Sequence, residues 1–160
     1  MVIQVVKSTF LTLGQILFNN NDTAQLSRTC NNNKCIVCEN DIHNPIDRVT
    51  STVSGQSFPV DTNMNCDNGG IYMVKGACKA QYVGKTVTFG KRLGEHLSTC
   101  KSSAVYGHKQ SCPDCKNVDD FEVTYIENYH KRGKYTLSER EFLWNYRIRG
   151  TINVQKTLKA

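Results

Sequence analysis

Two Cys-x-x-Cys pairs are the first residues in this sequence whose types and spacing could do chemistry. Such pairs form tight turns that direct two thiolates at one tetrahedral metal ion. The first pair belongs to the stretch CNNNKCIVC, in which another cysteine precedes it closely, and a fourth cysteine follows after a loop. This spacing predicts a structural zinc site formed by Cys30, Cys35, Cys38 and Cys66.

The second pair, Cys112 and Cys115, leaves its remaining ligands open. Cys78, Cys100 and His108 all carry suitable donor atoms, because thiolates and imidazole both bind zinc. The favoured set for a second zinc ion is Cys78, His108, Cys112 and Cys115.

Eight cysteines are also compatible with a disulfide framework or with a thiol-redox protein. The apolar amino end, residues 1–18, is interrupted by polar side chains and lacks a basic start and a small-residue cleavage site, so it does not resemble a signal peptide. No run of 18 apolar residues is present, and no membrane-spanning helix is predicted. Disulfides are therefore disfavoured, and we expect an intracellular protein that is not secreted.

Charge is unevenly distributed along the 160 residues. Residues 1–67 carry four basic and six acidic side chains, a balance of −2, whereas residues 68–160 carry sixteen and eight, a balance of +8. A basic half favours a polyanionic partner, because lysines and arginines that neutralise phosphates release counterions. A solvated charged surface is the alternative.

The elements that must position any site are predicted beyond residue 68. Two β-prone stretches, 70–75 and 80–84, form a hairpin. Apolar residues at four-residue spacing predict a helix over 88–100, although two internal glycines weaken it by about 1 kcal/mol each. A third strand is predicted over 121–127 and a second helix over 138–149.

The preceding chain divides into an N-terminal segment, 1–28, and a Cys-rich zinc-binding module, 29–67. Within this module residues 40–67 mix turn residues with short apolar pieces. They predict a loop-rich segment that metal binding stabilises. The main domain then spans 68–160.

Polar residues recur on these predicted elements. Tyr72 and Tyr82 lie on the two strands of the hairpin, ten residues apart, and Arg92 follows ten residues later. His96 lies one helical turn beyond Arg92, on the same face. Each residue has a simpler interpretation when it is taken alone: strand tyrosines usually pack, and the arginine and histidine are compatible with a solvated or packed surface.

Two more residues follow near the second helix. Glu141 lies close to its start, and Asn153 follows the helix-ending Gly150. Ser138 and Glu141 have the spacing of a capping box. A carboxylate that caps a helix is not free to bind a metal, so the two roles compete.

The triplets GIY (70–72) and YVG (82–84), together with the downstream residues in this order and spacing, resemble the GIY-YIG nuclease signature over about residues 68–155. The resemblance implies an α/β (α+β) fold, with a three-stranded antiparallel sheet flanked by helices. It also implies hydrolysis of DNA phosphodiesters. The implied catalytic set is Tyr72, Tyr82, Lys85, Arg92, His96, Glu141 and Asn153.

Each member then has an implied role. Glu141 would bind one catalytic Mg²⁺ or Mn²⁺, which suits a single carboxylate plus waters. Tyr72 would help to deprotonate the attacking water, with Lys85 and Arg92 lowering its pKa, and Arg92 would also contact the phosphate. The remaining members would hydrogen-bond within the site, and Asn153 would orient the site or touch the substrate.

The upstream stretches RTCNNNKCIVC and NCDNGGIY resemble the endonuclease module of Penelope-like retroelements, in which a cysteine cluster precedes the nuclease core. That group has two cysteines between the tyrosine motifs, whereas here only Cys78 is present and Gly76 stands where another is expected. His108 matches one of the group's histidines, and Cys112 replaces another. This resemblance implies integration or processing of mobile-element or viral DNA, and a nuclear location.

A zinc-stabilised nucleic-acid-binding module without catalysis is the alternative function. RNA also remains open as a substrate, since phosphate contacts alone do not identify the sugar. The sequence leaves the oligomeric state undetermined.

Overall fold

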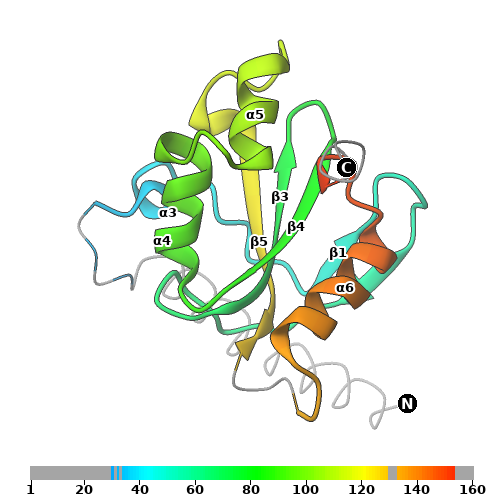
Figure 1. The fold of residues 1–160 in the computed structure, drawn as a ribbon. Helices are drawn as coiled ribbons and strands as arrows, with labels where there is room; N and C mark the ends of the chain where they lie inside the picture. Colours follow the sequence, from blue (N-terminus) through cyan, green and yellow to red (C-terminus); the bar gives the residue numbers. More distant parts are fainter. Residues whose placement is uncertain (1–29, 31, 33, 130–132, 154–160) are drawn as a thin grey trace, which may run out of the picture.

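The computed structural model describes residues 30, 32, 34–129 and 133–153 (Figure 1). The N-terminal segment 1–28 lies outside these described residues. The elements follow one another as α3 (Ile36–Glu39), β1 (Arg48–Thr50), β2 (Ser57–Pro59), β3 (Gly70–Gly76), β4 (Gln81–Thr86), α4 (Phe89–Gly94), η1 (Glu95–Thr99), α5 (Ala104–Ser111), η2 (Val118–Asp120), β5 (Phe121–Asn128) and α6 (Leu137–Ile148).

The central sheet has three antiparallel strands in the order β4-β3-β5. Tyr72 of β3 pairs with Gly84 of β4, and Val74 pairs with Tyr82. On its other side β3 pairs with β5, with a register shift between Ile71 and Tyr72. The three predicted strands and the predicted fold class are therefore confirmed.

The segment before this sheet is more regular than expected. β1 and β2 form a two-stranded sheet, and His43 forms a parallel bridge with Val123 of β5. The Val123 N–H donates to the Ile42 carbonyl, and the Asn44 N–H donates to the Val123 carbonyl, each at 2.8 Å. Outside these two three-residue strands, most of residues 40–67 is turn or irregular backbone, as expected for a loop-rich segment. The strands themselves were not predicted, because three residues are too short to show alternation.

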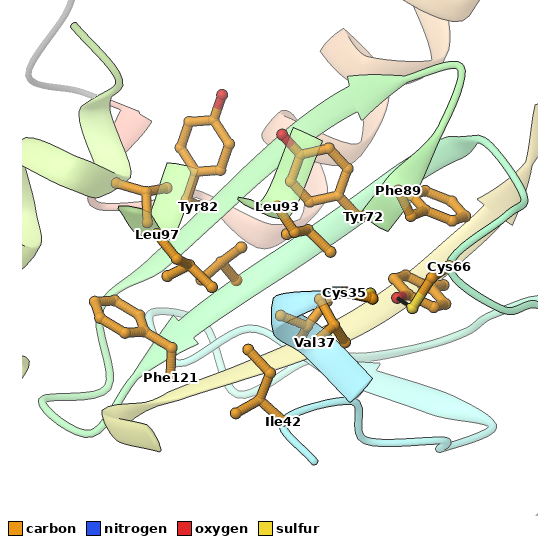
Figure 2. Close-up of a cluster of buried hydrophobic side chains, with 14 of the residues drawn as sticks. Cys35, Val37, Ile42, Cys66, Tyr72, Tyr82, Phe89, Leu93, Leu97 and Phe121 are labelled. Atoms are coloured by element: carbon orange, nitrogen blue, oxygen red, sulfur yellow. Dashed lines mark hydrogen bonds between the residues drawn. The ribbon is translucent and has the colours of Figure 1, made fainter. Parts of the chain in front are cut away.

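Each face of the central sheet has its own buried cluster, because successive strand residues point to opposite faces. The first face meets α3, α4 and α5, and its buried side chains include Tyr72, Val74, Tyr82, Phe89, Leu93 and Leu97. Cys35, Val37 and Ile42 of the upstream segment lie in the same cluster (Figure 2). The Cys-rich segment and the main domain thus share one core.

The second face is covered by α6 and the β1–β2 sheet (Figure 1). Trp144 and Ile148 of α6 pack against alternate strand residues that include Ile71, Met73 and Val83. These two helix residues are four apart and therefore lie on one side of α6. Their burial sets the rotation of the helix about its axis.

A buried ion pair also holds α6 against β5. The Glu127 side chain is 9% exposed, and its carboxylate accepts hydrogen bonds from Arg140 Nε at 2.6 Å, from Arg140 Nη2, and from Trp144 Nε1 at 3.0 Å. These charge-assisted bonds come from two successive turns of α6. They position the neighbouring Glu141 with respect to the sheet.

The cap of α6 differs from the prediction. Thr136 is the N-cap, its Oγ1 accepts from the Glu139 N–H at 3.2 Å, and the Glu139 carboxylate accepts from the Thr136 N–H at 2.7 Å. The capping box predicted for Ser138 and Glu141 was therefore wrong by two residues. The pairs Thr136/Glu139 and Ser138/Glu141 both have the spacing of a capping box. The start of α6, set by its buried face, decides that Thr136 and Glu139 form it. Glu141 is consequently not engaged in this capping box.

The helix predicted over 88–100 is present, but it changes type. α4 ends at Gly94 and continues as η1, a π-helix over Glu95–Thr99. π-helical turns are rare and often occur at functional sites. α5 was not predicted, because only Val105 of its eight residues is buried and no apolar stripe marks it.

Candidate active site and metal centres

Tyr72 and Tyr82 lie on one face of the sheet, as diagonal neighbours on β3 and β4, with ring centroids 6.2 Å apart. Both rings rise from the same face in Figure 2. A Cβ at Gly84 would lie 2.5 Å from the Tyr72 hydroxyl and 2.7 Å from the Tyr82 ring. Glycine at the third position of the YVG triplet is therefore required by the close approach of the two tyrosines.

His96 connects Tyr72 to the helical layer. Tyr72 Oη lies 2.5 Å from His96 Nε2, and His96 Nδ1 makes a short hydrogen bond with Ser103 Oγ. Both Tyr72 and His96 are almost fully buried. Sequence reasoning missed Ser103, and its only signal was the N-cap position before α5, where its hydroxyl accepts from the Tyr106 N–H. The chain Tyr72–His96–Ser103 is a continuous path for a proton.

Burial raises the pKa of Tyr72 well above its ordinary value, and the neighbouring Tyr82 raises it further, whereas Arg92 lowers it. Burial, together with the negative charge of Glu141, also raises the pKa of Tyr82. As predicted, Arg92 lowers the pKa of Tyr72. Desolvation of the buried phenolate outweighs this attraction, so the net pKa is raised. At neutral pH the Tyr72 hydroxyl is therefore protonated in this structure.

Arg92 of α4 is half-buried beside Tyr72, and its guanidinium donates to Glu95 at 2.8 Å. This hydrogen bond raises the pKa of Arg92 further, so the guanidinium stays charged. Arg92 and Glu141 both influence the pKa of Tyr82. The cation, the carboxylate and the two phenols therefore share one electrostatic environment.

Glu141 reaches this environment from the opposite face of the sheet. Its Oε2 lies 3.2 Å from Lys85 Nζ, and this ammonium also donates to Ser138 Oγ at 2.6 Å. β4 is an edge strand, so residues from both faces can meet beside it. The Glu141 carboxylate, with its side chain 26% exposed, lines an open hollow of about 540 Å³. One accessible carboxylate fits Mg²⁺, which keeps most of its waters.

Asn153 covers the edge of β4. Its Oδ1 accepts from the Val83 N–H at 2.8 Å, and its Nδ2 donates to the Val83 carbonyl at 2.9 Å. The Ile152 N–H donates to the Gln81 carbonyl at 3.0 Å. The segment after α6 thus pairs with an otherwise open strand edge. Of the two roles expected for Asn153, this geometry favours orientation of the site.

The first cysteine cluster brings together all four expected ligands. The Sγ atoms of Cys30, Cys35, Cys38 and Cys66 lie within 4.8 Å of one another. The Cys38 and Cys66 sulfurs are 3.5 Å apart, close to the roughly 3.8 Å edge of a tetrahedron with zinc–sulfur bonds of 2.3 Å. Burial raises the pKa of Cys38 to about 12 and that of Cys66 further, so ionisation of these thiols needs a nearby cation.

This cluster packs directly against α4. The Gly90 N–H donates to the Cys66 carbonyl at 2.9 Å, and a Cβ at Gly90 would lie 3.1 Å from the Cys66 Cβ. The Tyr125 hydroxyl lies 3.0 Å from Cys66 Sγ, and the Tyr125 ring stacks on Phe89 with centroids 4.2 Å apart. Phe89 in turn meets the edge of Tyr72. Packing therefore connects the first cluster to the candidate active site.

The second cluster contains the favoured set, Cys78, His108, Cys112 and Cys115, again within 4.8 Å. His108 Nε2 lies 3.2 Å from Cys78 Sγ. A Cβ at Gly76 would lie 2.7 Å from Cys115 Sγ, so Cys115 occupies the space toward which a side chain at position 76 would point. Cys100 lies outside the cluster, and its sulfur contacts Ser102 Oγ at 3.3 Å. The four donors fit tetrahedral zinc.

All eight cysteines lie among the described residues, and each is a free thiol. The structure thus offers two thiol-rich centres that could hold metal ions, with no disulfide framework. Among the described residues no helix combines the length and the apolar character needed to cross a bilayer.

The sequence model of the GIY-YIG catalytic domain matches residues 68–151. This match covers more than half of the chain, and the chain therefore belongs to the GIY-YIG catalytic domain family, whose members are endonucleases. No match was found among curated proteins or among solved structures. The resemblance to the superfamily is confirmed, and the closer relation to Penelope-like elements stays a prediction.

Proposed function

We propose that this protein is a metal-dependent DNA endonuclease that hydrolyses phosphodiester bonds at the edge of β4. The observation that carries the proposal is the position of Tyr82 on β4, with its ring centroid 6.2 Å from that of Tyr72. Arg92 and Glu141 are both near enough to Tyr82 to influence its pKa. These groups come from both faces of the sheet in a member of an endonuclease family. A binding module without catalysis would not need a buried tyrosine–histidine pair beside an accessible carboxylate.

Glu141 is the proposed ligand of one Mg²⁺ or Mn²⁺. When bound, this ion would stabilise negative charge on the scissile phosphate and on the leaving oxygen. The ammonium of Lys85 forms an ion pair with the Glu141 carboxylate at 3.2 Å. The charged guanidinium of Arg92 contacts the phosphate, where its planar fork suits two oxygens.

Tyr72 is the proposed base toward the attacking water. Its raised pKa makes the free phenolate rare at neutral pH, so Tyr72 must transfer its own proton as it accepts one. His96 Nε2, at 2.5 Å, is the acceptor in reach, and Ser103 orients the imidazole from Nδ1. Tyr82 positions the water or the phosphate beside them.

Both cysteine clusters are proposed to bind structural zinc. The first stabilises the start of α4, and the second joins α5 to the β3–β4 turn. A cysteine cluster upstream of the nuclease core is the feature that relates this chain to Penelope-like endonuclease modules. We therefore propose a role in mobile-element or viral DNA processing, in the nucleus.

The test is cleavage of supercoiled plasmid with Mg²⁺, with Mn²⁺ and with EDTA added immediately before the assay. We expect divalent-ion-dependent nicking or linearisation, lost in Tyr72→Phe and Glu141→Gln at unchanged zinc content. Lys75→Gln is the matched control, because Lys75 pairs with Glu122 elsewhere on β3. A folded wild-type protein that binds DNA and leaves plasmid, single strands and RNA intact would favour the alternative, a zinc-stabilised binding module.

A further inference from the structure

The outer face of α6 carries two large aromatic side chains. Phe142 is 75% exposed and Tyr146 is 72% exposed. They are four residues apart and therefore lie one above the other on the helix surface. The buried residues of this helix, Trp144 and Ile148, are turned toward the sheet. A paired aromatic surface in solvent marks an interaction site more strongly than single exposed residues do.

This aromatic surface is continuous with the candidate active site. Phe142 lines the same hollow as Glu141 and Ser138, and Ser138 Oγ accepts from Lys85 Nζ. Tyr146 extends the surface by one helical turn away from the carboxylate. A ligand that lies across Glu141 and continues along α6 must therefore meet an aromatic side chain next.

A cation completes the rim of the hollow. Arg149 lines it, is exposed, and adopts the left-handed conformation with φ +56° at the C-cap of α6. Glycine is the residue that usually occupies this position, because its lack of a Cβ removes the steric penalty. Arg149 thus places a positive charge beside the hollow, although its left-handed backbone conformation is unfavourable for a residue with a Cβ.

We propose that Phe142 and Tyr146 stack on unpaired nucleobases beside the phosphodiester to be cleaved, while Arg149 binds a neighbouring phosphate. The inference rests on the proposed nuclease function and adds the structural class of its substrate. A nucleic acid strand offers a flat apolar base next to each phosphate, which matches an aromatic surface between a carboxylate and a guanidinium. Base faces inside a regular duplex are already stacked, so the preferred DNA carries unpaired bases.

The test measures DNA binding without cleavage, by fluorescence anisotropy in Ca²⁺. The probes are three DNAs of one sequence: a regular duplex, the same duplex with a three-base bulge, and the single strand. Phe142→Ala, Phe142→Leu and Tyr146→Ala are compared with wild type. Val53→Ala is the matched control for loss of an exposed apolar side chain elsewhere, in the turn between β1 and β2.

We expect Phe142→Ala and Tyr146→Ala each to weaken binding to bulged and single-stranded DNA by about tenfold, the effect of losing one base stack. Binding to the duplex should change less than twofold. Phe142→Leu should behave like Phe142→Ala, because it keeps apolar surface but has no ring. Arg149→Gly should lower the salt dependence of binding by about one counterion without reducing thermal stability.

Equal losses on all three DNAs, or wild-type affinity in the alanine variants, would overturn the stacking proposal and leave the nuclease proposal intact. A wild-type protein that binds none of the DNAs would overturn both. Sedimentation velocity tests the competing occupant of this surface. A wild-type dimer that becomes monomeric in Phe142→Ala and Tyr146→Ala would assign the aromatic pair to self-association and refute the inference.

Discussion

Asn153→Ala should separate a positioning role from a substrate contact. The side-chain amide makes two hydrogen bonds to Val83, one at 2.8 Å to its N–H and one at 2.9 Å to its carbonyl. Val83 lies between Tyr82 and Gly84, the residues that shape the phenol pair. Loss of the amide therefore frees the edge of β4 at the point where the site is assembled.

The two hydrogen bonds contribute about 1 kcal/mol each, so the free energy of unfolding should fall by about 2 kcal/mol. For a domain of this size that corresponds to a decrease in Tm of about 6 °C. A displaced Tyr82 should lower kcat/KM for plasmid cleavage by at least about tenfold. Thr151→Val is the graded control, because Thr151 accepts one long hydrogen bond, 3.3 Å from the Gln81 N–H, worth about 0.5 kcal/mol.

Differential scanning calorimetry and steady-state cleavage measure these two quantities. The reasoning is refuted if Asn153→Ala keeps the wild-type Tm but raises KM for DNA, because that pattern identifies a substrate contact. It is also refuted if Thr151→Val destabilises the protein as much as Asn153→Ala does, since the number of hydrogen bonds lost then does not determine the effect.

Three further predictions concern stability. Arg140→Met should lower the free energy of unfolding in urea by about 3 to 5 kcal/mol, because it leaves the Glu127 carboxylate buried without its cation; if adding Glu127→Gln restores none of the loss, the unpaired charge is not its cause. Burial lowers the pKa of His43 to about 4, so the stability that is present above pH 6.5 should be lost as the pH falls toward 4. The loss should be at most about 3 kcal/mol, and the partial exposure of the imidazole reduces it further. His43→Phe keeps the stack on Tyr125 and should remove this dependence, and an unchanged pH profile would contradict the assignment. Cys66→Ser should reduce bound zinc, measured by mass spectrometry of the metal, from about two ions to about one per chain and lower the Tm by on the order of 10 °C; retention of two ions would show that the first cluster is not a zinc site.

Much of the fold was predictable from local pattern. The strands of the hairpin and β5 alternate or run apolar over enough residues to be recognised. The apolar stripe of Phe89, Leu93 and Leu97 marked α4 and its continuation η1. The short β1 and β2 and the polar α5 were missed, because three residues or a single buried side chain carry no period. Their structure depends on contacts with elements distant in sequence.

The candidate metal centres were also predictable, and for a similar reason. Cys-x-x-Cys spacing holds two donors within one turn, so the sequence leaves only the distant ligands undetermined. Cys78 and His108 join the second centre, whereas Cys100, which has the same donor atom, does not. The difference lies in where the β3–β4 turn and α5 place their side chains.

The sequence alone determined which residue types the candidate site can use, their order along the chain and the elements that carry them. Only the tertiary structure decided two properties of the site. The rotation of α6, set by burial of Trp144, leaves Glu141 out of the capping box and beside Lys85. The burial of Tyr72 raises its pKa against the pull of Arg92. These outcomes depend on desolvation and packing between segments far apart in the chain, and residue spacing contains no information on either.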